Sequence, residues 1–232
     1  MVRPTRKKQI PNLQEAIKET AWKQIAEFGA PALSLRAIAR ELKITAPAIY
    51  NYFPSRDDLV TALIVDAFTS LGDSQKSVLE ANAGKESTAR LSRLGLAYRD
   101  WAVTYPQRYQ LIFGTPIPGY EAPADVTLPA AAWALVPLIE TIQTLHETEK
   151  LRSDNLAKLT PKLRSMLVAW QEFVSQSGIQ VHIEVLYLAL VIWSRVHGLV
   201  TLELGHQHPS FIDDPGEIFR REIANIQLQY IA

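Results

Sequence analysis

The chain has 232 residues, of which 47% are apolar and 21% charged, an ordinary composition for a folded protein with one large domain or two smaller ones. It contains no cysteine, which excludes disulfide scaffolds and thiolate metal sites. The 24 basic and 24 acidic residues cancel, but residues 1–60 carry ten of the basic and only six of the acidic ones. This basic head indicates an anionic partner near the N-terminus, although chance can produce the same asymmetry.

Residues 1–9 (MVRPTRKKQ) are basic but lead into no apolar run, so no signal peptide is expected. The longest apolar run, Val185–Trp193, is shorter than the roughly 20 residues that a membrane-spanning helix needs. We therefore expect a cytoplasmic protein with no membrane span. The N-terminal arm is either a nucleic-acid contact or a solvated tail, and its cationic residues are Arg3, Arg6, Lys7 and Lys8.

The first predicted helix begins near Pro11 and ends before Gly29, because proline suits a first helical turn and glycine suits the position after a last one. Ser34 then offers an N-cap oxygen to a second, short helix that reaches Leu42. Apolar residues recur at helical intervals along the first helix and predict one buried face made of Leu13, Ile17, Ala21, Ile25 and Phe28. The second helix has a similar face made of Leu35, Ile38, Ala39 and Leu42.

A third short helix is predicted from Thr45 to Phe53, where Pro54 stops it. We expect the Thr45 hydroxyl to cap the N–H of Ala48. Ile49 and Phe53 lie four residues apart and share the inward face. The residues that then point outward, or lie on the flanks, are Ala46, Pro47, Ala48, Tyr50, Asn51 and Tyr52.

Ser55 caps a fourth, longer helix that runs to about Ala83, with Asp57 and Asp58 in its first turn, where carboxylates suit the helix dipole. The chain then remains helical and shows no strand-like alternation, so the predicted fold is all-α. Segment 114–129 is the one long irregular stretch. The further helices are predicted at about 87–105, 108–113, 128–148, 160–177, 179–204 and 214–231.

Two short helices joined by a tight turn, with a helix before and after them, have the layout of a helix-turn-helix unit. Small residues at the tip of the second helix let it enter a DNA groove, tyrosine hydroxyls can bind phosphates, and asparagine can bind a base edge. Arg56, beside the helix dipole, is expected near a phosphate. Arg36 either reaches the edge of the groove, which we favour, or is merely exposed. A plain αα-hairpin is the alternative interpretation of this segment.

The segment Ser34–Leu59 (SLRAIARELKITAPAIYNYFPSRDDL) resembles the DNA-binding signature of the tetracycline-repressor (TetR) family of transcriptional regulators. The resemblance covers residues 11 to about 70. In this family the turn usually carries glycine where Lys43 stands, so a reshaped or mildly strained turn is expected. The resemblance implies DNA contacts by Ser34, Arg36, Thr45, Ala46, Pro47, Ala48, Tyr50, Asn51, Tyr52 and Arg56. It also implies three parts: a basic arm (1–9), a DNA-binding domain (10–70), and an effector-binding and dimerisation domain (71–232).

Two later stretches, YRDWAVTYPQRYQLIFGTPIPGY and WSRVHGLVTLELG, resemble the C-terminal domain of the subgroup named for a Trp, a His and a Gly. Those residues would be Trp193, His197 and Gly198, and the first two share a helix face. His197 is interpreted as a core histidine in preference to a ligand contact. The resemblance implies an aromatic effector pocket, whose candidates are Trp101, Tyr105, Tyr109, Phe113, Trp133, Trp170, Phe173, Tyr187, Trp193 and His197.

The helix at 179–204 is apolar nearly all round, and the helix at 214–231 has one apolar stripe. We predict that both pair with their copies in a four-helix dimer interface, with burial inside one chain as the alternative. A dimer would also present two helix-turn-helix units to a near-palindromic operator on double-stranded DNA.

The sequence as a whole predicts a dimeric regulator, most simply a repressor, that a small and largely apolar effector releases from DNA. The resemblance implies that rotation of the fourth helix changes the spacing of the two recognition helices. A DNA-binding protein without an effector and a helical protein-binding adaptor are the alternatives.

An enzyme is not expected, because no HExxH, P-loop, G-x-S-x-G or G-x-G-x-x-G motif occurs. No cofactor is expected either. His206 and His208 form a weak candidate metal pair.

Overall fold

The computed structural model describes residues 11–152, 158–175 and 178–232. Within these ranges the secondary structure is helical, with one isolated antiparallel bridge between Leu151 and Ile231 and no strand. The predicted all-α fold is therefore confirmed. The basic arm predicted at residues 1–9 lies outside the described residues.

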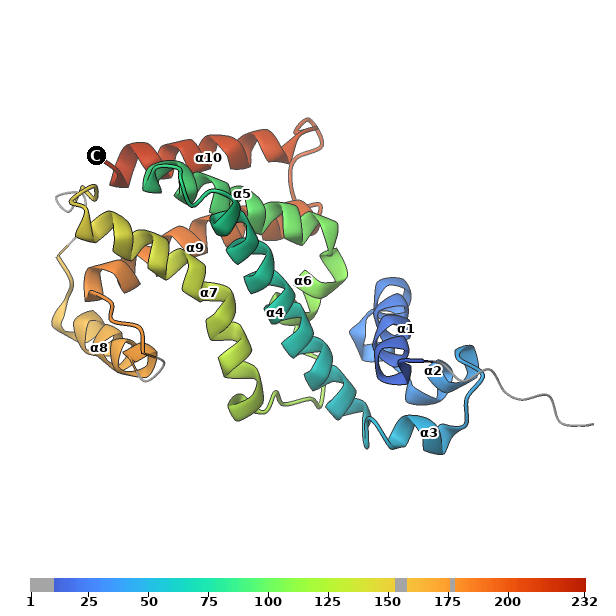
Figure 1. Ribbon diagram of the computed structural model, residues 1–232. Coiled ribbons are helices and arrows are strands. Elements are labelled where there is room, and N and C mark those ends of the chain that lie inside the picture. Colours follow the sequence, from blue (N-terminus) through green and yellow to red (C-terminus); the bar gives the residue numbers. More distant parts are fainter. Residues whose placement is uncertain (1–10, 153–157, 176–177) are drawn as a thin grey trace, which may run out of the picture. The chain divides into compact units, whose positions relative to one another are not determined.

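The helices follow one another along the chain as coloured in Figure 1. Their ends agree with the predicted ends within a few residues, and the largest differences are the starts of the seventh and ninth helices. Their bounds are α1 (Leu13–Phe28), η1 (Ala30–Ala32, a 3₁₀ turn), α2 (Leu35–Glu41), α3 (Ala46–Tyr50), α4 (Arg56–Ala81), α5 (Ser87–Thr104), α6 (Pro106–Phe113), α7 (Ala124–Glu147), α8 (Pro161–Ser175), α9 (Ile183–Leu204) and α10 (Pro215–Tyr230).

Two compact units make up the chain. The first contains the chain up to Ala67 together with Gln107–Pro129, and the second contains Phe68–Pro106 and Ala130–Ala232. The division therefore falls inside α4. The segment after α5, which sequence reasoning assigned to the C-terminal domain, groups with the N-terminal helices.

The first unit is built around the predicted apolar faces of its short helices. Ile17 and Ala21 of α1, Ile38 of α2 and Ile49 of α3 are each fully buried. Phe28, predicted on the same face of α1, is instead 63% exposed. It is the last residue of the helix, so the chain turns away before any neighbour covers it.

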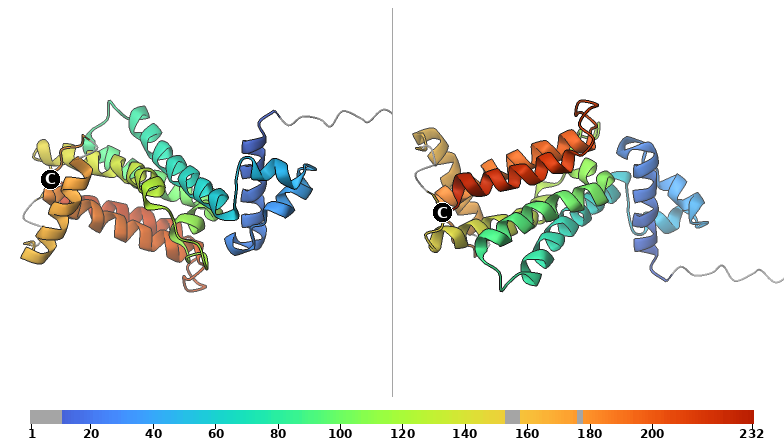
Figure 2. Two further views of the ribbon diagram at one scale, coloured as in Figure 1. Left: turned by 90° about the horizontal axis from the view of Figure 1, so that it is seen from below. Right: turned by 90° about the horizontal axis from the view of Figure 1, so that it is seen from above.

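In the second unit, α9 and α10 lie side by side, as the views in Figures 1 and 2 agree. Arg99 of α5 donates from Nε to Glu203 of α9 at 2.8 Å and makes a second bond from Nη2. Arg195 of α9 pairs with Glu222 of α10. These ion pairs, together with apolar burial along α9, hold the three helices to one another.

By length and composition alone, α7 and α9 could each cross a membrane. The most apolar windows of these helices are 44% and 39% buried inside the protein. This is weak evidence for a membrane span, because the core helices of soluble proteins meet the same criteria.

Candidate DNA-binding site

The turn between α2 and α3 is closed by backbone hydrogen bonds from Lys43 N to Arg40 O at 3.2 Å and from Ile44 N to Ala39 O at 3.0 Å. This pattern ends a helix on a left-handed residue, a position that favours glycine. Lys43 occupies it with a φ of 55°, so the expected non-glycine turn with positive φ is present. The same bonds fix the direction in which the chain enters α3.

The faces of α3 separate as its sequence predicts. Ile49 is fully buried and Phe53 is 3% exposed, so this side packs inward. Tyr50 and Tyr52 are 41% and 45% exposed, which is unusual for large aromatic side chains. Asn51 is exposed beside them. Four small or neutral positions on the outer and flanking side accompany them, namely Thr45, Ala46, Pro47 and Ala48, of which Ala48 is half-buried.

The start of α3 differs from the prediction. Thr45 occupies the N-cap position, but its side chain makes no capping bond. The N–H of Ala48 is bonded instead to the backbone carbonyl of Thr45 at 3.0 Å. The helix itself ends at Tyr50, earlier than expected, and Asn51 continues it by one residue with helical dihedral angles. A 3₁₀-type bond from Tyr52 N to Ile49 O tightens this last turn.

The start of α2 carries the predicted cap. Ser34 Oγ accepts the N–H of Ala37 at 3.4 Å, and Ser34 N donates to Gln24 Oε1 at 3.3 Å. Gln24 is 8% exposed and comes from α1, so it fixes the chain just before α2 begins. Arg36, in the first turn, is exposed.

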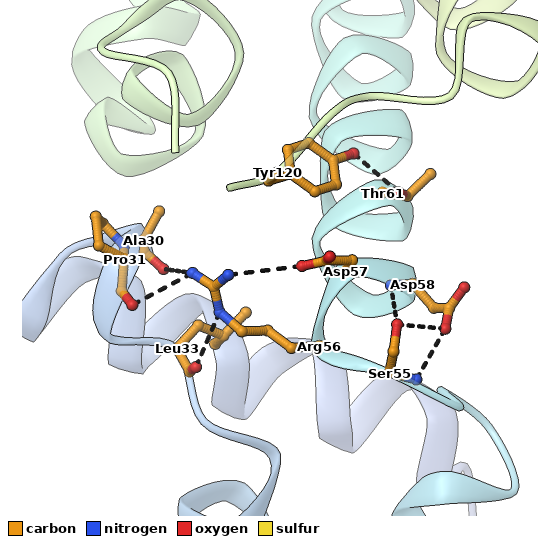
Figure 3. Close-up of polar contacts among 9 residues, drawn as sticks. All are labelled: Ala30, Pro31, Leu33, Ser55, Arg56, Asp57, Asp58, Thr61 and Tyr120. Atoms are coloured by element: carbon orange, nitrogen blue, oxygen red, sulfur yellow. Dashed lines mark hydrogen bonds and ion pairs between the residues drawn. The ribbon is translucent and has the colours of Figure 1, made fainter. Parts of the chain in front are cut away.

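Arg56 lies at the first position of α4, and its guanidinium points back to the connection between α1 and α2 (Figure 3). Nε donates to Leu33 O at 3.3 Å, and Nη2 donates to both Ala30 O and Pro31 O at 3.2 Å. Nη1 lies 3.6 Å from Asp57 Oδ1. The residue that sequence reasoning assigned to a phosphate thus has its donors directed at the protein itself.

The start of α4 is closed by a reciprocal capping box. Asp58 Oδ2 accepts from Ser55 N at 2.8 Å and from Ser55 Oγ at 2.6 Å, and Asp58 N donates to Ser55 Oγ at 3.1 Å. Figure 3 shows this box next to Arg56. These bonds cap the first turn of α4, which carries Arg56.

Two further contacts hold α4 within the first unit. Lys18 of α1 donates to Asp66 Oδ2 at 2.7 Å. Burial lowers the pKa of Lys18, but its hydrogen bonds to Asp66 and Glu15 outweigh this effect and raise that pKa above its ordinary value. Tyr120 and Thr61 share a hydroxyl–hydroxyl bond of 2.8 Å, which ties the segment before α7 to α4 (Figure 3).

In the second unit, two of the predicted pocket residues lie together. Trp193 and His197 of α9 have ring centroids 4.9 Å apart, and His197 Nδ1 lies 2.8 Å from the Tyr98 hydroxyl. Desolvation lowers the pKa of His197 below its ordinary value, so the ring is neutral at pH 7. Sequence reasoning missed Tyr98, which is buried and lies 99 residues away along the chain.

The other predicted pocket residues are dispersed. Trp101 of α5 is buried, and its indole donates to Ser70 at 3.0 Å. Trp133 and Phe173 are 37% and 44% exposed. The remaining candidates are Tyr109, buried and in edge contact with Phe113 in the first unit; Tyr105, exposed and beside Trp101; and Trp170 and Tyr187, both half-buried.

A groove of about 540 Å³ runs along α9 and α10 and contains none of the predicted aromatic residues. Its lining includes the apolar side chains of Leu199 and Ile218 and the charged side chains of Arg195, Glu217, Arg221 and Glu222. Among the described residues, no three His, Asp or Glu side chains gather as metal ligands would.

Comparisons with known proteins cover both units. Residues 17–63 match a family profile described as "Bacterial regulatory proteins, tetR family". Residues 91–226 match one described as "Tetracyclin repressor-like, C-terminal domain". The first match contains the helix-turn-helix segment, and the second contains Trp193 and His197.

The chain is 32% identical over 208 residues to the HTH-type transcriptional regulator Rv1816 of Mycobacterium tuberculosis, covering 89% of this chain and 87% of that protein. It is similar to the same extent to the HTH-type transcriptional regulator Mb1846 of Mycobacterium bovis. Among solved structures it is 34% identical to the regulatory protein SCO4313, with a TM-score of 0.71 and coverage of 93% and 95% of the two chains. A protein of unknown function from Rhodococcus sp. RHA1 is 17% identical with a TM-score of 0.73, covering 98% of this chain and all of that one, and shares the fold.

Proposed function

Because the chain belongs to the TetR family of transcriptional regulators, we propose that it is a dimeric repressor that a small-molecule effector releases from its operator. DNA binding through a helix-turn-helix unit is the property of the family. The dimer, the effector and the sign of regulation are specific to this proposal. A transcriptional regulator works where DNA is, so we also propose a cytoplasmic location.

The observation that carries the proposal is the division of the segment 46–53, α3 and the turn after it, into a buried and an exposed side. Ile49 and Phe53 are buried, while Tyr50, Asn51 and Tyr52 are exposed without a charge among them. Neutral hydrogen-bonding groups on an exposed helix suit a DNA groove, where tyrosine binds phosphate oxygens and asparagine binds a base edge. The small residues that precede them on the helix let it approach the bases closely.

The exposed apolar residues of α9 and α10 support a dimer. Leu190 and Leu202 of α9 are 39% and 38% exposed, and Ile218 and Leu228 of α10 are 36% and 66% exposed. Monomeric proteins seldom leave large apolar patches in water. We propose that these two helices pack against their copies, which supplies two recognition helices for a near-palindromic operator.

The contact among Tyr98, Trp193 and His197 supports an effector site. A neutral imidazole can accept a hydrogen bond at one ring nitrogen and donate one from the other, and aromatic side chains provide apolar contact. We propose that an apolar effector with one polar group binds near these residues.

The decisive experiment is a salt titration of binding to duplex DNA from the flanks of the gene that encodes the protein. We expect specific binding whose logarithmic affinity falls linearly with the logarithm of salt concentration. Arg36→Ala should reduce that slope by about 0.9, the value for one lost phosphate contact, and Tyr50→Phe should weaken binding without changing the slope. The absence of salt-dependent DNA binding would favour a helical adaptor.

The dimer is tested by sedimentation of Ile218→Glu, which places a charge in the proposed interface. This variant should dissociate, while Phe28→Glu, at a 63% exposed apolar residue of the first unit, should sediment like the parent protein.

The effector proposal is tested by melting curves, because a bound ligand must raise the melting temperature. A panel of small apolar compounds that leaves the melting temperature unchanged would favour the DNA-binding protein without an effector.

A further inference from the structure

We propose that Arg56 is a positioning residue, which fixes the connection between α1 and α2 on the first turn of α4, and that it does not neutralise a DNA phosphate. The inference rests on the proposed DNA-binding function. From its charge alone, Arg56 would be expected to bind a phosphate, whereas the proposed role is structural.

The donors of the Arg56 guanidinium are engaged on the protein. Its fork carries five N–H groups in a plane. Nε is bonded to Leu33 O, and Nη2 is bonded to Ala30 O and Pro31 O, at 3.2–3.3 Å. Nη1 faces the carboxylate of Asp57 at 3.6 Å. A phosphate contact would therefore require existing bonds to break or would have to use Nη1 beside a carboxylate.

The carbonyl groups explain why the connection depends on Arg56. Gly29 O is satisfied by Ala32 N, and Ala30 O also accepts from Leu33 N. Pro31 O and Leu33 O each accept a hydrogen bond from the guanidinium of Arg56. Leu33 is 3% exposed, so an unsatisfied carbonyl there would be costly.

This connection determines where α2 begins. Ser34 follows it directly, with its N–H bonded to Gln24 of α1 at 3.3 Å and its hydroxyl capping α2. Gln24 thus fixes the chain from one side and Arg56 fixes it from the other. Arg36 lies two residues beyond Ser34, so its placement depends on both anchors.

The charge of Arg56 is also partly neutralised where it lies. Its side chain is 30% exposed and the adjacent Asp57 carboxylate is 55% exposed. A cation paired in this way attracts a distant phosphate less than an isolated one does. Arg36 and Lys43 are exposed and remain candidates for phosphate contact in this unit.

Arg56→Lys separates the two roles, because lysine keeps the charge but cannot place a planar fork on three carbonyls. Arg56→Ala removes both the charge and the fork. Arg36→Ala serves as the matched control for a phosphate contact. Each variant is titrated with salt on the gene-flanking duplex and on a random-sequence duplex of the same length.

If Arg56 positions α2, Arg56→Lys and Arg56→Ala should both lose about tenfold in affinity for the flanking duplex. The two variants should share one salt slope and one random-sequence affinity, because both lack the fork that positions α2 and the charge of residue 56 contributes to neither quantity. The proposal is overturned if Arg56→Lys binds like the parent while Arg56→Ala loses about 0.9 in slope. It is also overturned if neither variant changes binding.

Amide hydrogen exchange without DNA supplies a second test that does not depend on the proposed function. The amides of Ser34 and Ala37 should exchange faster in Arg56→Lys than in the parent, and the amide of Ile64 should not change. Unaltered exchange at Ser34 and Ala37 would overturn the proposal even if the variant were otherwise stable. If the parent protein itself fails to bind DNA, the function falls while this exchange result still decides the role of Arg56.

Discussion

The indole of Trp133 in α7 lies directly on the backbone of Gly72 in α4. A Cβ atom at residue 72 would come within 2.3 Å of Trp133 Cδ1 and 3.1 Å of the Trp133 carbonyl oxygen. The indole N–H is bonded to Asp73 at 3.0 Å, and Lys76 lies over the ring at 4.9 Å. Trp133 thus serves as a contact between two helices, and glycine makes this close approach possible.

Gly72→Ala should therefore destabilise the protein by about 1–3 kcal/mol, because the added methyl group must displace a ring held on three sides. Urea unfolding followed by tryptophan fluorescence measures the effect. Gly84→Ala is the matched control, since a Cβ there meets nothing within 4 Å. Equal stability of the two variants would show that α7 yields freely at this point.

Two neighbouring residues of α3 should affect different properties when substituted: Ile49 should affect stability and Tyr50 should affect DNA binding. Ile49→Ala should lower the free energy of unfolding by about 2–5 kcal/mol, because Ile49 is fully buried. Tyr50→Ala should change stability by less than about 0.5 kcal/mol, as expected for an exposed position, while it weakens specific DNA binding. Chemical unfolding and DNA titration on both variants test the two faces together. A large loss of stability in Tyr50→Ala would mean that its exposed ring supports the fold.

Two ion pairs of similar composition should contribute unequally to stability. Arg99 and Glu203 are only 18% and 15% exposed, whereas Arg220 and Glu217 are 49% and 74% exposed. Glu203→Gln should cost about 2–3 kcal/mol, because it leaves a largely buried guanidinium without its counter-charge. Glu217→Gln should cost less than about 1 kcal/mol. Similar losses in the two variants, measured by chemical unfolding, would contradict this ranking.

Stability should fall as the pH drops below about 6.5, partly through His197. Desolvation lowers its pKa in the folded state, so below the ordinary value of 6.5 the unfolded chain binds the proton more readily. The stabilising effect is therefore present above pH 6.5 and is lost as the pH falls towards the folded-state pKa. His197→Asn should flatten the dependence of unfolding free energy on pH between 7 and 5.

Tyr98→Phe is the control for this dependence. It removes the hydroxyl that contacts His197 Nδ1 but keeps the aromatic ring of residue 98. Because burial is the cause of the lowered pKa, most of the pH dependence should survive in this variant. A profile as flat as that of His197→Asn would mean that the hydrogen bond, and not desolvation, governs the titration.

The amino-acid sequence by itself determined the helical fold and the two faces of the recognition helix. These features follow from short-range periodicity: residues four apart share a helix face, and although α3 ends at Tyr50, the bond from Phe53 N to Ile49 O keeps Phe53 on the side of Ile49. Cap residues also act locally, and Ser34 and Ser55 mark the starts of α2 and α4 for that reason. For Lys43, the family resemblance supplied the expectation, because glycine usually stands at this place in the turn, and the structure has Lys43 there with a φ of 55°.

Only the tertiary structure decided which partners the long side chains take. Arg56 reads in sequence as a free cation, but its bonds reach back 23 to 26 residues to a connection whose place depends on the packing of α1 and α4. The hydrogen bond between Tyr98 and His197 joins residues 99 positions apart. The bond between Trp133 and Asp73 joins residues 60 positions apart. Periodicity assigns a residue to the inside or outside of its own helix. Which residue of another helix a side chain contacts depends on how the separate helices pack together. That packing is determined by residues throughout the chain.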